Sequence, residues 1–242
     1  MKIYKNTSGK WMARLCAVCL LSTLLSSCLK SSNSYYAPPV AFVSFIQASP
    51  NQPALDFYMN GNKVNTGPVN YGDYIDYFRA YTGQRTVNFY AQGSTNKLFS
   101  DTVTLNTNVA YSLFLTNASS TSASPAILLL TDSISKPATG KASIRFVNIS
   151  PDAPAVDLAV KDSAAFVSNK AFKGYSSFLP MQGGKTYTFN VLQHGTSTVL
   201  ATLSNVPINT GLVYTIWFHG LASSSNTNDK PAVGIITNAY YY

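Results

Sequence analysis

The chain has 242 residues, only 11% of which are charged, and its 17 Lys and Arg outnumber nine acidic residues. All nine acids are Asp; Glu, a common residue of exposed helix faces, does not occur, whereas Thr, Ser, Asn and Tyr are abundant. This composition excludes a mainly helical protein and favours an all-β chain. The cations are scattered singly rather than in runs, which argues against nucleic acid as a partner.

Residues 1–27 predict an export signal. Four cations and no acid in the first 14 residues precede an apolar run over residues 15–25, which is too short to span a bilayer. The sequence Leu25-Ser26-Ser27-Cys28 follows and resembles the lipobox of bacterial lipoproteins, in which the Cys is acylated and begins the mature chain. The resemblance implies a lipid bilayer as partner, held through acylated Cys28. The alternative is an ordinary secretory peptide with an incidental Cys.

Processing at Cys28 would leave a mildly basic chain without a cysteine pair. Four of the 17 cations lie in the signal, so 13 remain against nine acids, a net charge of +4. Cys16 and Cys19 also lie in the signal, so no thiol pair remains for a disulfide or a metal, and we expect no cofactor. Residues 28–39, polar and then Pro-rich, predict a tether. We expect a lipid-anchored protein of the cell envelope, on the outer membrane. The sequence leaves open whether the protein lies on the periplasmic side or on the cell surface.

The remaining chain is organised around a repeated stretch. Ser49–Asp56 and Ser150–Asp157 share the pattern S-P-x-x-P-A-x-D, 101 positions apart. Each copy lies between two runs of alternating apolar and polar residues, which are typical of half-buried strands. Polar and chain-breaking residues at 133–141 predict a linker. We therefore expect one β-sandwich repeat over residues 40–132 and a second over residues 142–242.

Further strands follow in both copies. Asn60-Gly61 predicts a hairpin turn in the first copy. Matching apolar positions align later strands of the two copies: Val87, Phe89 and Ala91 with Tyr187, Phe189 and Val191; Tyr111, Leu113 and Leu115 with Tyr214, Ile216 and Phe218; Pro125–Ile127 with Pro231–Val233. The spacing predicts two tandem immunoglobulin-like β-sandwich domains of about seven strands each, without a helix after the signal.

The repeated pattern also carries a family resemblance. A strand such as Arg145-Phe146-Val147 before S-P-x-x-P-A-x-D, the step Tyr71-Gly72, and a Gly before a later strand (Gly83, Gly183) resemble the bacterial domain of unknown function numbered 4397. The resemblance implies secreted or lipid-anchored β-sandwich modules, often in tandem. It implies no established activity and no catalytic residues.

The repeated Asp residues, Asp56 and Asp157, have two readings. Because both copies contain them, we expect each carboxylate to lock the preceding proline-rich turn by accepting its backbone N–H groups. The alternative is a calcium site made with Asp152, since hard cations prefer several oxygen ligands. Asn51 replaces Asp152 in the first copy, which favours the turn.

Residue types for catalysis are sparse. His194 and His219 have no counterparts in the first copy, and we find neither a Cys nucleophile nor a Gly-x-Ser-x-Gly elbow. We therefore expect a protein that is not an enzyme. The alternative is an envelope enzyme acting on glycans through an unrecognised site.

The residues of the chain favour a binding, adhesion or presentation role instead, with a glycan or an envelope protein as partner. Tyr71, Tyr74, Tyr77 and Arg79 combine flat rings with hydrogen-bonding groups, which suits sugars or peptides. Strand alternation would place Tyr71 and Tyr77 on one face and Tyr74 with Phe78 on the other, so one row is expected in the core.

Three short motifs resemble the Asp-Ser/Thr-apolar acceptor of bacterial O-glycosylation: Asp101-Thr102-Val103, Asp132-Ser133-Ile134 and Asp162-Ser163-Ala164. The linker copy at Asp132 is the best candidate, since an extended and exposed segment is accessible to a modifying enzyme.

Overall fold

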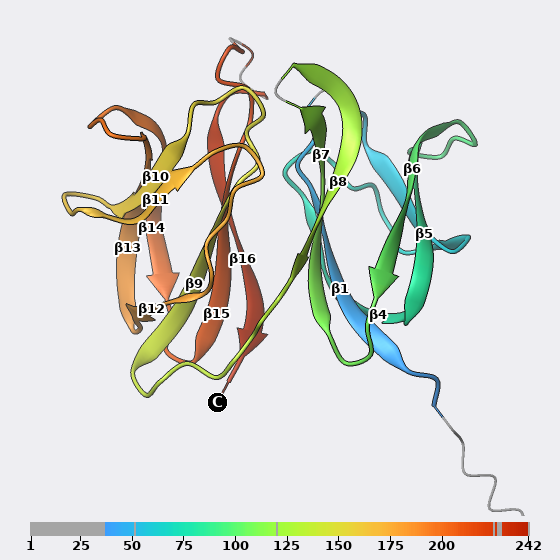
Figure 1. Cartoon of the computed structure of the whole chain (residues 1–242), viewed down its shortest axis with the longest axis horizontal. Helices are drawn as coiled ribbons and strands as arrows, with labels where there is room; N and C mark the ends of the chain where they lie inside the picture. The colour runs from blue at the N-terminus through green and yellow to red at the C-terminus, as the bar shows by residue number, and fades with distance from the viewer. Residues whose placement is uncertain (1–36, 51, 120, 225, 227–228, 242) are drawn as a thin grey trace, which may run out of the picture. The chain divides into compact units, whose positions relative to one another are not determined.

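The computed structural model describes residues 37–50, 52–119, 121–224, 226 and 229–241. The predicted signal and Cys28 lie outside these residues, as does most of the predicted tether. The described residues form sixteen β-strands (Figure 1) and contain no helix, hence none able to cross a membrane. The prediction of an all-β chain is confirmed.

The first eight strands form a sandwich of two four-stranded sheets. One sheet has the order β4-β1-β7-β8 and the other the order β3-β2-β5-β6. The strand bounds are β1 Val40–Gln47, β2 Leu55–Met59, β3 Asn62–Lys63, β4 Tyr74–Tyr81, β5 Gly83–Ala91, β6 Lys97–Leu105, β7 Ala110–Ser119 and β8 Ser122–Thr131.

The next eight strands repeat this order. Their sheets are β12-β9-β15-β16 and β11-β10-β13-β14. The bounds are β9 Lys141–Asn148, β10 Val156–Val160, β11 Ala165–Lys170, β12 Leu179–Gln182, β13 Lys185–Gln193, β14 Val199–Ile208, β15 Leu212–His219 and β16 Ala232–Tyr240. Each half thus has eight strands where we expected about seven, because β3 and β12, of two and four residues, are too short for periodicity to reveal.

Alternating apolar residues fill the space between the sheets of each sandwich. In the first half, the rings of Phe45, Phe57 and Phe89 lie within 4.7–5.3 Å of one another and are fully buried. Burying one such side chain contributes about 1.5–3 kcal/mol. The predicted Asn60-Gly61 hairpin is present, and both residues have the positive φ angles, 48° and 80°, that a two-residue hairpin loop favours.

Strand pairing tests the predicted correspondence between the halves. Val43 pairs with Tyr111, as Ile144 pairs with Tyr214, so the alignment of β7 with β15 is confirmed. The alignment of β5 with β13 was wrong by two residues, because Asp56 pairs with Tyr90 and Asp157 with Leu192. A shift of two preserves the inward and outward pattern, so alternation alone could not detect the error.

The outer faces of β1 and β9 are buried as well, against each other's sandwich. A third apolar cluster combines residues of both halves: Ile46, Ala48, Phe114 and Leu130 with Val147, Ile149, Trp217 and Ile236. The rings of Phe114 and Trp217 lie 6.4 Å apart. All sixteen strands accordingly belong to one compact unit.

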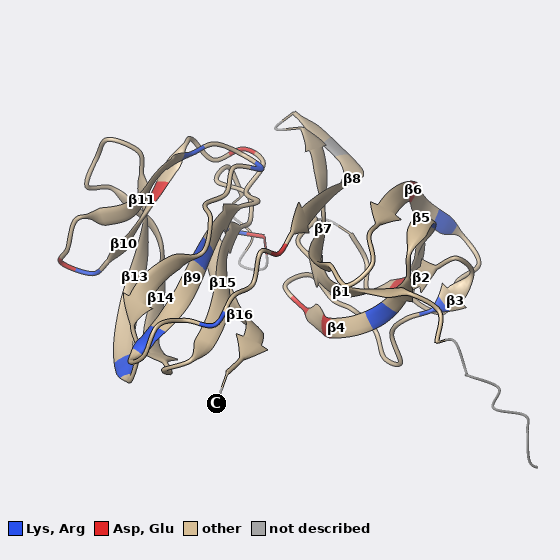
Figure 2. Ribbon diagram, turned by 60° about the horizontal axis from the view of Figure 1, so that its bottom comes forward, with Lys and Arg blue, Asp and Glu red and all other residues tan. Residues whose placement is uncertain are grey.

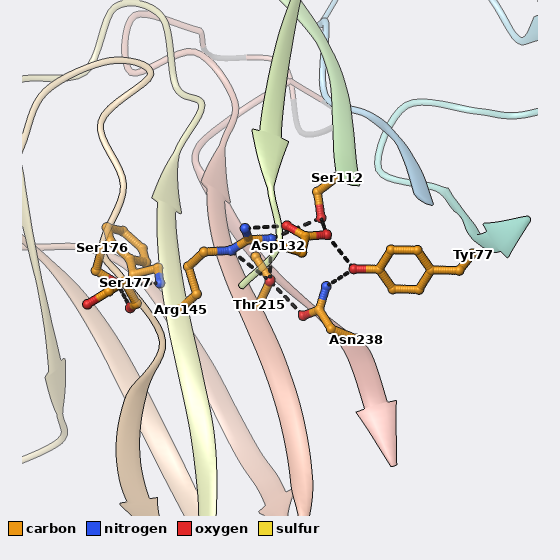
Figure 3. A network of polar contacts seen from close by, with 9 residues as sticks. Tyr77, Ser112, Asp132, Arg145, Ser176, Ser177, Thr215 and Asn238 are labelled. Atoms are coloured by element: carbon orange, nitrogen blue, oxygen red, sulfur yellow. Dashed lines mark hydrogen bonds and ion pairs between the residues drawn. The ribbon is translucent and has the colours of Figure 1, made fainter. Parts of the chain in front are cut away.

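A closed polar network continues this contact (Figure 3). Asp132, just after β8, accepts hydrogen bonds from Arg145 of β9, from Ser112 at 2.8 Å and from Tyr77. Arg145 also donates to Thr215 at 3.0 Å. Asn238 closes the ring, since it accepts from Thr215 at 2.7 Å and donates to Tyr77 at 2.9 Å. Asp132 and Arg145 are both buried, so each charge needs the other as its partner; either one alone would be a destabilising buried charge.

Candidate functional site

A β-bulge in β4 changes the predicted faces of the aromatic segment. Val43 pairs with Phe78 and Phe45 with Ile75, so two residues of β4 oppose Ser44 alone. Phe78 consequently packs on the core while Tyr74 is 47% exposed. The expectation that these two rings share a face was therefore wrong.

Tyr71 and Tyr77 lie in contacts between the two halves. The Tyr71 hydroxyl is 2.8 Å from Nδ1 of His219, and burial raises the pKa of Tyr71 above its usual value. Burial, together with the Asp132 carboxylate, also raises the pKa of Tyr77. Tyr74 and Arg79 are exposed and line two different cavities. The four predicted binding residues are therefore not brought together into one site.

Asp56 joins three segments of the first sandwich. Its carboxylate lies 2.8 Å from Lys63 of β3 and accepts from the Gly93 amide after β5 at 3.0 Å and from Asn65 at 3.3 Å. The Lys63 ammonium is the main cause that holds the pKa of Asp56 below its usual value. The carboxylate thus fixes β3 and the β5–β6 turn to β2.

Asp157 does the same in the second sandwich. It accepts from the Asn169 amide at 2.7 Å and from Ser168 at 2.9 Å, both in β11, and from His194 at 2.9 Å in the β13–β14 turn. Burial alone would raise the pKa of Asp157, but these donors lower it. The observed donors belong to β11 and to the β13–β14 turn rather than to the Ser150–Pro154 turn, which corrects the partners expected for this residue.

Asp152 contributes to a different loop, so the calcium alternative lacks its ligand set. Asp152 accepts from the Ala222 amide at 2.7 Å and from the Ser223 amide at 2.9 Å, between β15 and β16. Within the described ranges, no three His, Cys, Asp or Glu side chains cluster where they could hold a metal ion.

Replacing Asp157 by alanine should lower the free energy of unfolding by about 1–3 kcal/mol, since it removes the buried carboxylate that accepts hydrogen bonds from Asn169, Ser168 and His194. Calcium and chelator should leave the melting temperature of the natural chain unchanged. A melting temperature that rises with calcium in the natural chain, but not in Asp157→Ala, would reinstate the metal site.

Ser168, His194 and Asp157 have the residue types of a catalytic triad without its geometry. Both Ser168 and His194 contact the same oxygen of Asp157, and Ser168 Oγ is 3.5 Å from Nδ1 of His194, the nitrogen that already contacts the carboxylate. In a catalytic triad, the serine hydroxyl is hydrogen-bonded to the histidine nitrogen that does not contact the carboxylate, which here would be Nε2. The cluster instead serves to hold β11.

The linker glycosylation candidate meets a similar objection. Asp132 is only 5% exposed and its carboxylate is engaged by Arg145, although Ser133 is exposed. An enzyme that must read the Asp side chain cannot reach it in the folded chain.

A groove on the outer face of the β3-β2-β5-β6 sheet has the properties of a ligand site. It has a volume of about 310 Å³ and is lined by Tyr58, Gly61, Asn88, Tyr90, Ser94 and Thr95. We call it the tyrosine groove. Tyr58 of β2 pairs with Asn88 of β5, and the ring of Tyr58 lies 5.2 Å from that of Tyr90 at 74°. Both tyrosines are half-buried, so each ring is held by its neighbours while part of it is exposed.

Asn88 is oriented by a neighbour on the same face. Its side-chain oxygen accepts a hydrogen bond from Ser100 Oγ at 2.8 Å. This contact leaves the amide N–H₂ as a donor for a ligand. The tyrosine groove thus places a hydrogen-bonding amide beside two aromatic rings.

The second sandwich preserves the polar pair and lacks the rings. Thr202 donates to Asn190 at 2.9 Å, as Ser100 does to Asn88. Ala159 and Leu192 occupy the strand positions of Tyr58 and Tyr90. The same strand arrangement therefore forms without the tyrosines, whereas the Asn–Ser/Thr pair occurs in both halves. Neither tyrosine was predicted from the sequence, although an alignment of β5 with β13 in the correct register distinguishes them from Ala159 and Leu192.

One stretch of the chain, which covers the first sandwich and the start of the second, is similar to a known family. Residues 41–159 match the model of DUF4397, a domain of unknown function, which confirms the family resemblance for that stretch. The comparison with curated proteins found no match.

Among solved structures, the CBMbc module of family CBM26 from Eubacterium rectale, in complex with maltoheptaose, is 10% identical, with 82% of this chain and 97% of that chain covered and a TM-score of 0.27. A streptococcal virulence factor described as binding alpha-glucan is 12% identical, with coverages of 84% and 99% and a TM-score of 0.24. With identities and TM-scores this low, the ligands of these proteins are not assigned to this chain.

Proposed function

We propose that this chain is a binding protein of the cell envelope, anchored in the outer membrane by acylated Cys28, and that its first sandwich binds a glycan in the tyrosine groove. The protein binds its ligand and does not transform it. The ligand class follows from the chemistry of the groove rather than from any relative.

The groove matches the two kinds of surface that a sugar ring presents. One face of many pyranoses is a patch of C–H groups, which packs against an aromatic ring, and the rim carries hydroxyl groups, which need hydrogen-bond partners. Tyr58 and Tyr90 supply the rings and Asn88 supplies the amide donor. Ser94 and Thr95 add exposed hydroxyls at the groove's edge.

One observation carries the proposal: two sandwiches with the same strand order share the polar pair, and only one of them has the aromatic pair. Half-buried tyrosines on the outer face of a sheet, which the fold does not require, are best explained by a ligand.

The lining also explains why we propose binding rather than catalysis. None of the six lining residues is a carboxylate or an imidazole. General acid–base chemistry on a glycosidic bond requires such groups within hydrogen-bond reach of the bond.

Tyr58→Ala and Tyr90→Ala should each weaken glycan binding at least tenfold while the fold is retained. The natural chain is first screened against an array of soluble and envelope polysaccharides, and the best ligand is then titrated by calorimetry. Tyr175→Ala, at a tyrosine that is 51% exposed in the second half, is the matched control and should bind normally. Binding by both groove variants at natural affinity would contradict the assignment.

The anchor has its own test. Labelled fatty acid should enter the natural protein in cells and should not enter Cys28→Ala, because the thiol is the acylation site. Label persisting in the variant would rule out lipidation at this residue.

A further inference from the structure

A second cavity opens at the side of the first sandwich, where the edge strands β3 and β4 face each other. It has a volume of about 250 Å³ and is lined by Met59, Asn60, Asn62, Lys63, Val64, Phe78, Arg79, Ala80, Tyr81 and Arg85. We call it the cationic pocket. Lys and Arg occur on both β3 and β4 in Figure 2. The cavity thus combines an apolar wall with three positive side chains.

The apolar wall belongs to the core of the sandwich. Met59 and Ala80 are 7% and 6% exposed, and the ring of Phe78 packs edge-on against Phe57 at 6.1 Å. These side chains are held in place whether or not the pocket is filled. A ligand therefore meets a preformed surface.

Among the described residues, two of the three cations have no carboxylate partner. Lys63 is paired with Asp56 at 2.8 Å. The Arg85 guanidinium donates to the neutral carbonyl oxygens of Tyr81 at 2.9 Å and Thr82 at 3.1 Å, which position it without cancelling its charge. Arg79 is exposed and makes no hydrogen bond or ion pair with the residues that the structure describes. The pocket therefore carries two uncompensated positive charges, suited to an anion that accepts from planar guanidinium groups.

The second sandwich shows that the fold does not need these cations. Ala165 takes the position of Lys63 opposite β10, and Pro180 takes that of Arg79 opposite β9. Tyr187 of β13 takes the position of Arg85 in β5, two residues before the inward Phe189 and Val87. All three charges are absent from the half that has the same topology.

The pocket lies beside the point where the tether enters the first strand. Val40 pairs with Tyr81, and the Thr82 amide donates to the carbonyl of Pro39 at 3.3 Å. Pro39 lies only 11 positions after Cys28, a span of at most about 40 Å when fully extended. The ring of Tyr81, 59% exposed, borders the same opening, and tyrosine favours the interface between water and lipid.

We infer that the cationic pocket binds the phosphate group of an anionic membrane lipid, with the guanidinium groups of Arg79 and Arg85 on the phosphate oxygens and the apolar wall beside the glycerol. This inference rests on the proposed lipid anchor, which keeps the pocket near a bilayer surface. It assigns to the first sandwich a membrane contact separate from the tyrosine groove.

The test uses the mature chain, residues 28–242, with Cys28→Ser so that no acyl chain contributes. The protein is sedimented with phosphatidylcholine vesicles that contain or lack phosphatidylglycerol. It should bind the anionic vesicles in preference to the neutral ones. Arg79→Gln should weaken that binding about fivefold, since each cation near an anionic surface contributes about 1 kcal/mol, whereas Lys161→Gln, at an exposed lysine of the second half, should not.

Arg79 is the informative position because, among the residues that the structure describes, its side chain makes no hydrogen bond or ion pair that a substitution would break. Equal binding to both kinds of vesicle, or binding that Arg79→Gln leaves unchanged, would overturn the inference. Glycerol phosphate that binds the chain while anionic vesicles do not would overturn the lipid as the source of the phosphate. Tyr58→Ala should retain vesicle binding, so failure here is distinguishable from failure of the glycan proposal and of the fatty-acid labelling.

Discussion

Replacing Asp132 by alanine is expected to lower the free energy of unfolding by about 3–5 kcal/mol, because it leaves a buried positive charge without its partner. Arg145 is 2% exposed, and Asp132 is the carboxylate that it contacts. The substitution also removes the acceptor of the hydroxyl groups of Tyr77 and Ser112. Urea denaturation followed by tryptophan fluorescence measures the change, since Trp217 lies in the apolar cluster between the halves.

Two further variants interpret that result. Asp101→Ala, at an exposed carboxylate of β6, is the matched control and should change stability by less than about 0.5 kcal/mol. The double replacement Asp132→Leu with Arg145→Met should cost less than Asp132→Ala alone, because it removes both buried charges. A loss below about 1 kcal/mol for Asp132→Ala would show that the network contributes little to folding.

Acidification should destabilise the protein through His219. This ring is buried, stacks on Trp217 at a centroid distance of 4.1 Å and lies 2.8 Å from the Tyr71 hydroxyl. Burial lowers the pKa of His219 to about 4 from 6.5. The unfolded chain therefore binds a proton near pH 6.5 that the folded chain binds only near pH 4, so stability is complete above pH 6.5 and falls as the pH drops toward 4.

The lowered pKa of His219 predicts that the free energy of unfolding falls by about 3 kcal/mol between pH 7 and pH 4. The pKa values of Asp56, Asp152 and Asp157 are lowered from 3.8, so these carboxylates titrate below this window. Urea denaturation at several pH values measures the slope, and His219→Gln should flatten it. An equally steep slope in the variant would assign the acid sensitivity to other groups.

The fold was predictable where its signal is local. Alternation placed Val43, Phe45, Ile144 and Phe146 in strands, and all four are fully buried. The polar residues between them misled us about the second face, since Arg145 is buried rather than facing solvent. Alternation of apolar and polar residues indicates that a strand has an apolar and a polar face. Only the tertiary structure shows that the other half of the chain covers the polar face.

The residues of the candidate site were not predicted from the sequence. Aromatic rings beside polar groups indicated binding, yet the rings singled out in β4 and before it were partly misplaced by a one-residue bulge opposite Ser44, which leaves no mark in the sequence. Tyr58 and Tyr90 lie 32 positions apart and approach each other only through the pairing of β2 with β5. Matching the strands of the two copies then shows that the second copy has no aromatic ring at either position.

The most direct test of the glycan proposal is a map of where the ligand binds. Backbone amide signals of the isotope-labelled mature chain are followed by NMR as the best ligand from the array is added. Signals of Tyr58, Gly61, Asn88 and Tyr90 should shift, whereas those of Ala159, Asn190 and Leu192, at the matching place in the second sandwich, should stay in position. Shifts confined to the second sandwich, or to the segment from Tyr71 to Arg79, would contradict the assignment of the tyrosine groove.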